Sequence, residues 1–336
     1  MLTERRAALL DLIIREYVDT ALPVGSQYVV QKYAMPYSSA TVRLEMARLE
    51  EGGYINQPHT SAGRVPSDKG YRYYIESLMR EEDVGWEEQQ TIRHQFHQAE
   101  RALEEWFQLT AAVLARMVSN FAVVTAPRSK QARLRHVQLV SLHELSVLCV
   151  AVLQEARVRQ QVLALRDASD QLALSEAADR INLRLGGGTA ADVRQLLPAV
   201  ASPLEETVVG ALADILDEES VAVGDIYRDG VREVLSQPEF ARSGRMIDLI
   251  DLLEQRSLAA AIPVRALQGG TVSVVIGSEN ASASMQECSI VVSSYGREDG
   301  ATGVVAVLGP TRMDYARTVP VVRFVAGTLS ELVSQI

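Results

Sequence analysis

The segment that follows Met35-Pro36 places several hydrogen-bond donors at close spacing along the chain. They are Ser38, Ser39, Thr41, Arg43 and Arg48. Hydroxyl and guanidinium groups bind phosphate oxygens and base edges, and an arginine can donate two hydrogen bonds to one guanine. Leu44 lies among these donors, and its apolar side chain matches the methyl group of a thymine. This combination predicts contact with double-stranded DNA.

A second polar set lies between Gly52 and Ser67, a stretch that contains no acidic residue. Its members are Gln57, His59, Thr60, Ser61 and Arg64. Tyr54-Ile55 and Arg64-Val65 suit two short strands, and the stretch between them, which contains Pro and Gly, suits the tip of a hairpin. Without a carboxylate to repel phosphate, such a hairpin can lie along the DNA backbone.

Helices on both sides of the hairpin would position these two polar sets. They are predicted over residues 3–20, from Ser26 to Met35-Pro36, from Ser38 or Ser39 to Glu51, and from Ser67 onward. In the third helix Val42, Met46 and Leu49 form one inward stripe, so Leu44 faces outward. This order over residues 1–80 predicts a winged helix-turn-helix, whose third helix reads the major groove. A generic helical bundle with a surface hairpin is the alternative.

The formal net charge of −10 argues at first against a nucleic-acid partner. Residues 1–80, however, carry 10 Lys and Arg against 9 Asp and Glu, so the acidity belongs to the rest of the chain. A module with so little positive charge binds phosphate weakly by itself. It therefore needs a second copy beside it, or a good direct readout of the bases.

The sequence also predicts the compartment. Cys149 and Cys288 lie in apolar runs and are interpreted as buried free thiols. The N-terminus shows no apolar core with a cleavage site, and no apolar run is long enough to span a bilayer. We therefore expect a cytoplasmic protein with no membrane partner.

Motifs of common enzymes are missing from the sequence. It contains no GxxxxGK[ST] or GxGxxG phosphate loop, no HExxH zinc motif and no GxSxG nucleophile turn. No catalytic residue, cofactor or metal ligand is predicted, and we expect that the protein is not an enzyme.

A near-heptad apolar stripe follows the N-terminal segment. It consists of Ile92, Phe96, Ala99, Leu103, Trp106, Thr110, Val113 and Met117. The spacing predicts one long helix over residues 86–120. The stripe can pair with a partner chain or pack on the sheet of its own domain, and both interpretations stay open.

The rest of the chain alternates between strand-rich and helical stretches. Strands are expected at 136–142, 145–153, 157–165, 271–277, 288–295 and 303–308, and helices over 172–256 and 314–335. Strands on both sides of a helical block predict an α+β domain that carries an insertion.

Several short motifs are spread over the whole chain. The N-terminal ones are Pro23-Val24-Gly25-Ser26, Ser38-Ser39-Ala40-Thr41-Val42-Arg43, the run from Gln57 to Pro66, and Gly70-Tyr71-Arg72. The C-terminal ones are the run from Ile276 to Asn280, Cys288-Ser289, and the run from Gly309 to Tyr315. Together they resemble the family of the heat-inducible transcription repressor HrcA, and the run from Gln57 to Arg64 is the most specific part of the match.

The resemblance implies a multidomain α+β fold. A winged helix-turn-helix over 1–80 is followed by a GAF-like domain over 86–168 and 236–336, into which a mostly helical dimerisation domain is inserted over 169–235. The resemblance also implies a homodimer that binds an inverted-repeat operator, the CIRCE element, ahead of chaperone operons and leaves it on heat stress. It further implies the GroE chaperonin as a partner.

Two other functions are open at this point. The GAF-like domain can sense a small molecule, with Glu279, Asn280, Arg312 and Asp314 either as ligands or as packing residues. An enzyme with an appended DNA-binding module is the other. The chain also departs from the resembled family, which usually has Asn where Leu44 stands, so we expect a changed contact at that position.

Overall fold

The computed structural model describes most of the chain. The described residues are 2–59, 62–98, 103–129, 131–154, 157–197, 202–221, 225–240, 271–296 and 301–334. The chain divides into two compact units, of which the first comprises residues 1–127 and 224–336 and the second comprises residues 128–223. Among the described helices, none combines the length and the apolar character that a bilayer crossing needs.

Residues 2–79, termed the N-terminal module, contain the predicted order of helices and hairpin. The elements are α1 (Glu4–Thr20), α2 (Ser26–Lys32), α3 (Ser39–Glu51), β1 (Ile55–Asn56), β2 (Val65–Pro66), α4 (Asp68–Tyr73) and a π-helical turn (Tyr74–Leu78). β1 and β2 pair as an antiparallel hairpin. The stripe predicted for α3 is buried, as are Leu9, Leu10, Ile13 and Ile14 of α1. These apolar faces form the core of the module, which leaves the opposite face of α3 in solvent.

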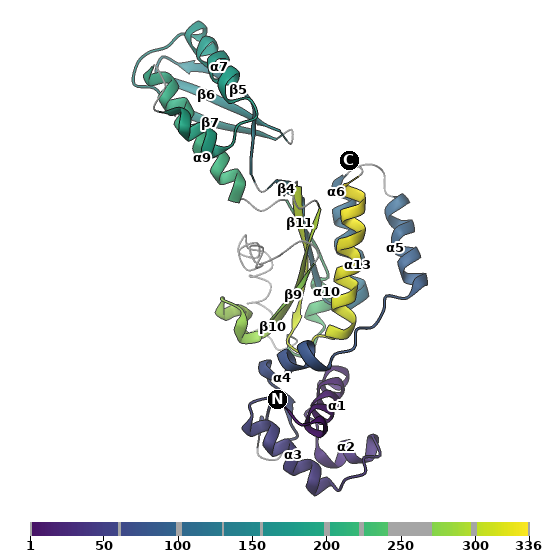
Figure 1. The fold of residues 1–336 in the computed structure, drawn as a ribbon. Coiled ribbons are helices and arrows are strands. Elements are labelled where there is room, and N and C mark those ends of the chain that lie inside the picture. The colour runs from purple at the N-terminus through teal and green to yellow at the C-terminus, as the bar shows by residue number, and fades with distance from the viewer. Residues whose placement is uncertain are drawn as a thin grey trace. The chain divides into compact units, whose positions relative to one another are not determined.

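The remainder of the first unit, residues 86–127 and 225–334, is termed the body. Its antiparallel sheet has the order β8 (Ile226–Asp229), β3 (Phe121–Thr125), β11 (Ala301–Pro310), β10 (Cys288–Gly296) and β9 (Val272–Ile276). Helices α6 (Leu103–Val118) and α13 (Tyr315–Val333) pack together on the sheet, beside α5 (Trp86–Gln98) (Figure 1). The other face of the sheet packs on α10 (Val231–Leu235). The three C-terminal strands and the last helix are therefore found where the sequence predicts them.

The predicted single helix over 86–120 is replaced by two helices, α5 and α6, which contact each other (Figure 1). Each helix has its own partner in the body. Glu88 of α5 accepts a hydrogen bond of 2.5 Å from Arg317 of α13, whereas α6 packs on β3 and β8. Thr110 and Val113 of the apolar stripe are buried there. Within α6 the stripe thus packs on the sheet of its own unit, while Ala99 lies outside the described residues.

The second unit is an α+β unit rather than a mostly helical one. It consists of β5 (Leu134–His143), β6 (Ser146–Leu153), β7 (Val158–Ala164), α7 (Gln171–Leu185), α8 (Ala190–Leu196) and α9 (Pro203–Val221). The three strands form an antiparallel sheet. Alternate residues of β6, among them Val147 and Cys149, are buried in one core with α7 and α9. The helices that follow the strands therefore cover them, and periodicity alone could not reveal this pairing.

The boundaries of the insertion consequently differ from the expected 169–235. The unit begins at Arg128, and its three strands pair with one another instead of joining the sheet order of the body. It ends at Val223, because residues 226–229 form strand β8 of the body sheet instead of continuing a helix. The part of the expected helical block over 241–256 lies outside the described residues.

Candidate nucleic-acid interface

The N-terminus of α3 is closed by a side-chain cap. The Ser38 hydroxyl oxygen accepts a hydrogen bond of 3.2 Å from the backbone N–H of Thr41 and lies 3.0 Å from the Thr41 hydroxyl. Ser38 is exposed, and Ser39 and Thr41 are partly exposed. A helix N-terminus presents N–H groups and a partial positive charge, so this end of α3 suits a phosphate group.

The solvent face of α3 carries the side chains that the sequence predicts to read bases. Arg43 and Leu44 are exposed, and the Leu44 side chain retains 54% of its accessible surface. Ser39 lies one turn before Arg43, and Arg48 lies one turn after Leu44, so two neighbouring rows run along the helix. Arg48 lies 3.9 Å from Glu45 at its closest approach and is itself half exposed. The structure therefore brings the predicted helix residues together on one open face.

A buried carboxylate fixes α3 against α1. Glu45 is 4% exposed, and its carboxylate forms ion pairs with Arg5 and Arg6 of α1, each at 2.8 Å. The hydrogen bond from Arg6 lowers the pKa of Glu45, against the opposing effect of burial, and the charge of Arg5 adds to this lowering. The angle between the two helices is thus held by ion pairs as well as by apolar contacts.

A second buried carboxylate joins α1 to α2. Glu16 is 1% exposed and accepts hydrogen bonds from the Tyr28 hydroxyl at 2.6 Å, the Lys32 ammonium at 2.5 Å and the Tyr33 hydroxyl at 2.9 Å. Sequence reasoning missed both Glu16 and Glu45, because an isolated glutamate in a helical pattern is usually a surface charge. The available signal was their position in the apolar stripe of each helix, next to residues that are buried.

The hairpin is braced across its tip. The Gln57 side-chain amide donates to the Ala62 carbonyl at 3.0 Å, and the Ala62 N–H donates to the His59 carbonyl at 2.8 Å. His59 is exposed at this tip. Thr60 and Ser61 lie outside the described residues. The tip therefore presents His59 to solvent while Gln57 helps to hold the turn.

Arg64 faces inward from the hairpin, toward α3. Its guanidinium group lies 2.9 Å from the Glu50 carboxylate, and its side chain is only 14% exposed. Its backbone exchanges two hydrogen bonds with Val24, at 2.8 and 2.9 Å. A Cβ atom on Gly63 would lie 2.5 Å from the Val24 carbonyl carbon, so glycine is required for this approach. Two motifs far apart in the sequence, Pro23-Val24-Gly25 and Gly63-Arg64, therefore meet at the base of the hairpin.

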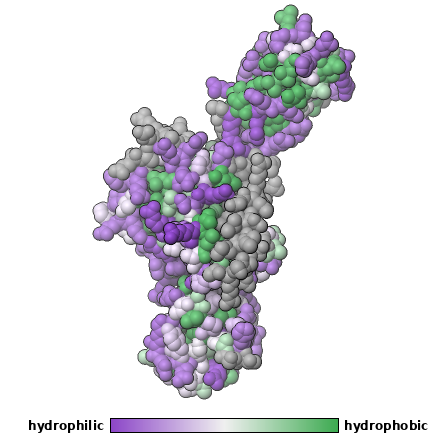
Figure 2. Space-filling model, turned by 180° about the vertical axis from the view of Figure 1, so that it is seen from behind, coloured by the Kyte–Doolittle hydropathy of each residue, from purple (hydrophilic) through white to green (hydrophobic). Residues whose placement is uncertain are grey.

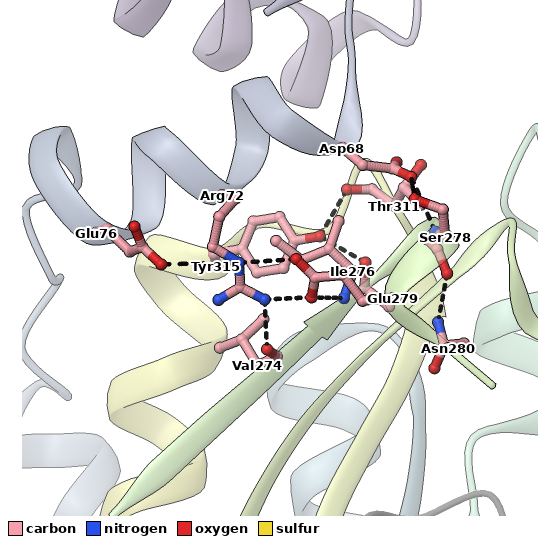
Figure 3. A network of polar contacts seen from close by, with 12 residues as sticks. Asp68, Arg72, Glu76, Val274, Ile276, Ser278, Glu279, Asn280, Thr311 and Tyr315 are labelled. Carbon is pink, nitrogen blue, oxygen red and sulfur yellow. Dashed lines mark hydrogen bonds and ion pairs between the residues drawn. The ribbon is translucent and has the colours of Figure 1, made fainter. Parts of the chain in front are cut away.

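The C-terminal candidates for a small-molecule site bind other parts of the chain. Glu279 accepts hydrogen bonds from Arg72 of α4, as Figure 3 shows. The Asn280 amide donates to three backbone carbonyls, including that of Cys288 at 2.9 Å. Arg312 binds Glu239 at 2.6 Å, and Asp314 caps α13 through the Arg317 N–H at 3.2 Å. All four side chains therefore have packing roles, which favours that interpretation over ligand binding.

Comparison with known proteins gives a consistent result over the whole chain. Residues 104–319 match the family described as HrcA protein C terminal domain. The chain is 41% identical to the heat-inducible transcription repressor HrcA of Roseiflexus castenholzii, with all of this chain and 95% of that protein covered. It is 39% identical to the repressor of the same name from Dehalococcoides mccartyi, with 100% and 97% covered. A crystal structure of a hypothetical protein has a TM-score of 0.59 at 23% identity, over 100% of this chain and 99% of that one.

Proposed function

Because the chain belongs to the HrcA family of heat-inducible transcription repressors, we propose that it binds an inverted-repeat DNA operator as a homodimer. A repressor of this kind is a regulator and has no enzymatic reaction. The cytoplasm, where bacterial DNA lies, is the compartment that this function requires. The N-terminal module then acts as a winged helix-turn-helix, with α3 in the major groove.

The observation that carries the proposal is the two-sided character of α3. One face is buried in the module, and the other presents Ser39, Arg43 and Leu44 to solvent beside the capped N-terminus. Ser38, Ser39 and Thr41 bind phosphate oxygens near this terminus, Arg43 reads a guanine, and Arg48 binds the backbone farther along. Leu44 contacts a thymine methyl, whereas the Asn that usually stands at this position in the family would bind adenine. The operator base at this position therefore differs.

The hairpin acts as the wing. Gln57, His59, Thr60 and Ser61 lie along the DNA backbone, in a stretch without acidic residues. Arg64 also belongs to the wing, where its pair with Glu50 holds the hairpin against α3. Contacts between the wing and the DNA backbone add affinity but carry little sequence information.

Dimerisation is supported by the open face of the sheet in the second unit. Val140, Leu148 and Val162 are cross-strand neighbours on the face that α7 and α9 do not cover. Val162 is 61% exposed, and Val158 and Val140 are exposed as well. Figure 2, which views the molecule from behind, shows hydrophobic residues gathered on this unit. Apolar patches of this kind mark protein interfaces, and a second copy would bury the same residues in a two-fold arrangement.

The weak charge of one N-terminal module favours a dimer. Two linked modules bind two half-sites, so the second binding event occurs at a high effective concentration. We further propose that heat stress releases the operator and that the GroE chaperonin assists folding, because an unpaired copy exposes the apolar sheet face. The alternative of a small-molecule sensor gains no support, since Glu279, Asn280, Arg312 and Asp314 bind the chain itself.

Binding of the full-length protein to a labelled inverted-repeat duplex of the CIRCE type tests the proposal. We expect the natural sequence to prefer this duplex over scrambled DNA by about a thousandfold at fixed salt. Arg43→Ala should weaken binding to the repeat by about 1–3 kcal/mol and leave binding to scrambled DNA almost unchanged. Arg15→Ala is the matched control, because it removes an exposed arginine from α1. Equal affinity of the natural protein for both duplexes, with GroE present, would refute the proposal.

A further inference from the structure

Two side chains of α4 reach from the N-terminal module into one turn of the body, residues 276–280 (Figure 3). Arg72 donates to the Glu279 carboxylate at 2.9 Å and to the Val274 carbonyl at 2.7 Å. Asp68 accepts two hydrogen bonds from Ser278, at 2.8 Å from the backbone N–H and at 2.7 Å from the hydroxyl. The positive Arg72 of α4 thus binds Glu279 of the body, and the negative Asp68 of α4 binds the hydrogen-bond donors of Ser278.

The turn has the shape of a receptor for Asp68. Gly277 has φ +47°, and a Cβ atom there would lie 2.4 Å from the nearest Asp68 carboxylate oxygen, so only glycine permits this approach. Glu279 also accepts a hydrogen bond of 2.9 Å from the Ile276 N–H. This bond lies within the turn and positions the carboxylate for Arg72. The buried Asn280 amide holds the turn through three backbone carbonyls. The motif from Ile276 to Asn280 is therefore organised around its contact with the module.

A third contact joins the other end of the module to the body. The Arg312 guanidinium donates to the Val18 carbonyl, near the end of α1, at 2.7 Å. The same guanidinium binds Glu239 and Gln237 of the body, at 2.6 and 2.7 Å. Since α1 and α4 are held at separate points, the module has a defined orientation on the body.

The Arg72–Glu279 pair is partly exposed on both sides, with 29% and 37% of the two side chains accessible. Exposed ion pairs contribute little to the free energy of unfolding. Their hydrogen bonds are directional, however, and therefore suited to fixing one part of a protein against another. This points to a role in orientation rather than in stability.

We infer that Ser278 and Glu279 are positioning residues for operator binding, which act through Asp68 and Arg72 by fixing the DNA-reading module on the body. This inference rests on the proposed function. When one module of a dimer has bound its half-site, a fixed second module is presented near the other half-site. A loosely tethered module samples more orientations, so the gain in affinity from the second half-site falls. Affinity for an isolated half-site stays the same, because Ser278 and Glu279 bind the module through α4, which we do not propose to contact DNA.

The experiment measures the affinity of the full-length protein for a single half-site duplex and for the complete inverted repeat. In the Ser278→Ala/Glu279→Gln variant we expect an unchanged half-site Kd and a complete-repeat affinity that is about 3–10-fold weaker. Arg72→Gln should cause the same selective loss from the module side, and adding it to Glu279→Gln should cause little further loss, because both remove one interaction. Asp217→Asn is the control, since it breaks an ion pair with Arg194 in the second unit, which is more exposed than the Arg72–Glu279 pair.

Each outcome of this comparison is decisive. An unchanged ratio of the two affinities in the Ser278→Ala/Glu279→Gln variant, with an unchanged melting temperature, overturns the inference and leaves the proposed function intact. Parallel weakening of both affinities overturns it too, because the substitutions would then act on the module itself. If the natural protein gains nothing from the second half-site, the proposed dimeric reading fails and the inference fails with it.

Discussion

The Glu50 carboxylate on α3 lies 2.9 Å from the guanidinium group of Arg64 on the hairpin. This pair joins the two elements that we propose to contact DNA, one in the major groove and one along the backbone. Because the Arg64 backbone is also paired with Val24, the hairpin is held at its base by two different segments of the module. The position of the wing relative to the reading helix is therefore set before DNA is bound, which reduces the entropy lost on binding.

Arg64→Gln should weaken specific binding without changing its salt dependence. Each phosphate contact contributes about 0.9 to the slope of log K against log salt, and Arg64 points at Glu50 instead of outward. We expect the slope of the variant to equal that of Arg15→Gln, which removes an exposed arginine on α1 and should keep full specific affinity. The slopes are measured by titrating the operator at salt concentrations from about 50 to about 200 mM. A slope reduced by about 0.9 in Arg64→Gln would instead identify a phosphate contact.

The sequence predicted those parts of the molecule in which local patterns decide the structure. The stripe of Val42, Met46 and Leu49 is a property of one helix, so its burial and the exposure of Leu44 followed directly. The direction of the Arg64 side chain depends on Glu50 and Val24, and no local pattern specifies such partners. For the same reason the sequence did not identify the partner of the motif over 276–280, because Asp68 lies 210 residues before Ser278.

The second unit shows the same limit at the level of a whole domain. The strands of residues 134–164 were correctly expected from their alternation, yet they were assigned to the wrong sheet. A strand with one apolar face can be covered by any amphipathic helix of the chain. Only the packed structure shows that α7 and α9 cover this sheet on one face, and that Val140 and Val162 are exposed on the other.

Val162→Glu should convert the proposed dimer into a monomer. The residue lies on the open sheet face next to Leu148, and a charge there would be desolvated in a face-to-face contact. Sedimentation at micromolar concentration measures the association directly. Leu183→Glu is the control, because Leu183 is an 89% exposed residue of α7 and a charge there costs little. A Val162→Glu protein that sediments as the natural one does would exclude this face from the interface.

Acid should weaken the N-terminal module through Glu16. Burial acts to raise the pKa of Glu16, but the hydrogen bonds from Lys32, Tyr28 and Tyr33 outweigh it and hold the pKa below its ordinary value of 4.5. A carboxylate with a lowered folded-state pKa stabilises the fold fully above its ordinary pKa, and this contribution is lost as the pH falls through the lower value. Glu16→Gln should therefore lower stability by about 1–3 kcal/mol at pH 7 and by less below pH of about 4.

Calorimetric melting at both pH values provides the comparison for Glu16. Glu51→Gln is a suitable control, since Glu51 is an exposed residue of the same module. We expect the melting temperature of this control to follow that of the natural protein at both pH values. If Glu16→Gln lowers stability by the same amount at both pH values, the ionised carboxylate is not the source of the stability that Glu16 contributes.

Tyr71→Phe should stabilise the junction between the module and the body. Tyr71 is 1% exposed and packs against the ring of Tyr315, with the two ring centroids 5.7 Å apart. Within the described part of the chain its buried hydroxyl has no hydrogen-bond partner, and such a group costs about 1–3 kcal/mol. Phenylalanine keeps the ring and removes this cost, so the melting temperature should rise by about 2–4 °C for each kcal/mol gained.

Tyr315→Phe is the natural control, because the Tyr315 hydroxyl is bonded to Ser289 at 2.7 Å and to the Thr311 carbonyl at 2.8 Å. Its removal should lower the melting temperature, opposite in sign to the effect of Tyr71→Phe. A lower melting temperature for Tyr71→Phe would mean that the phenol has a partner in solution. If the predicted signs hold, the temperature at which the repressor leaves its operator should rise in Tyr71→Phe and fall in Tyr315→Phe, because both residues lie where the DNA-reading module meets the body.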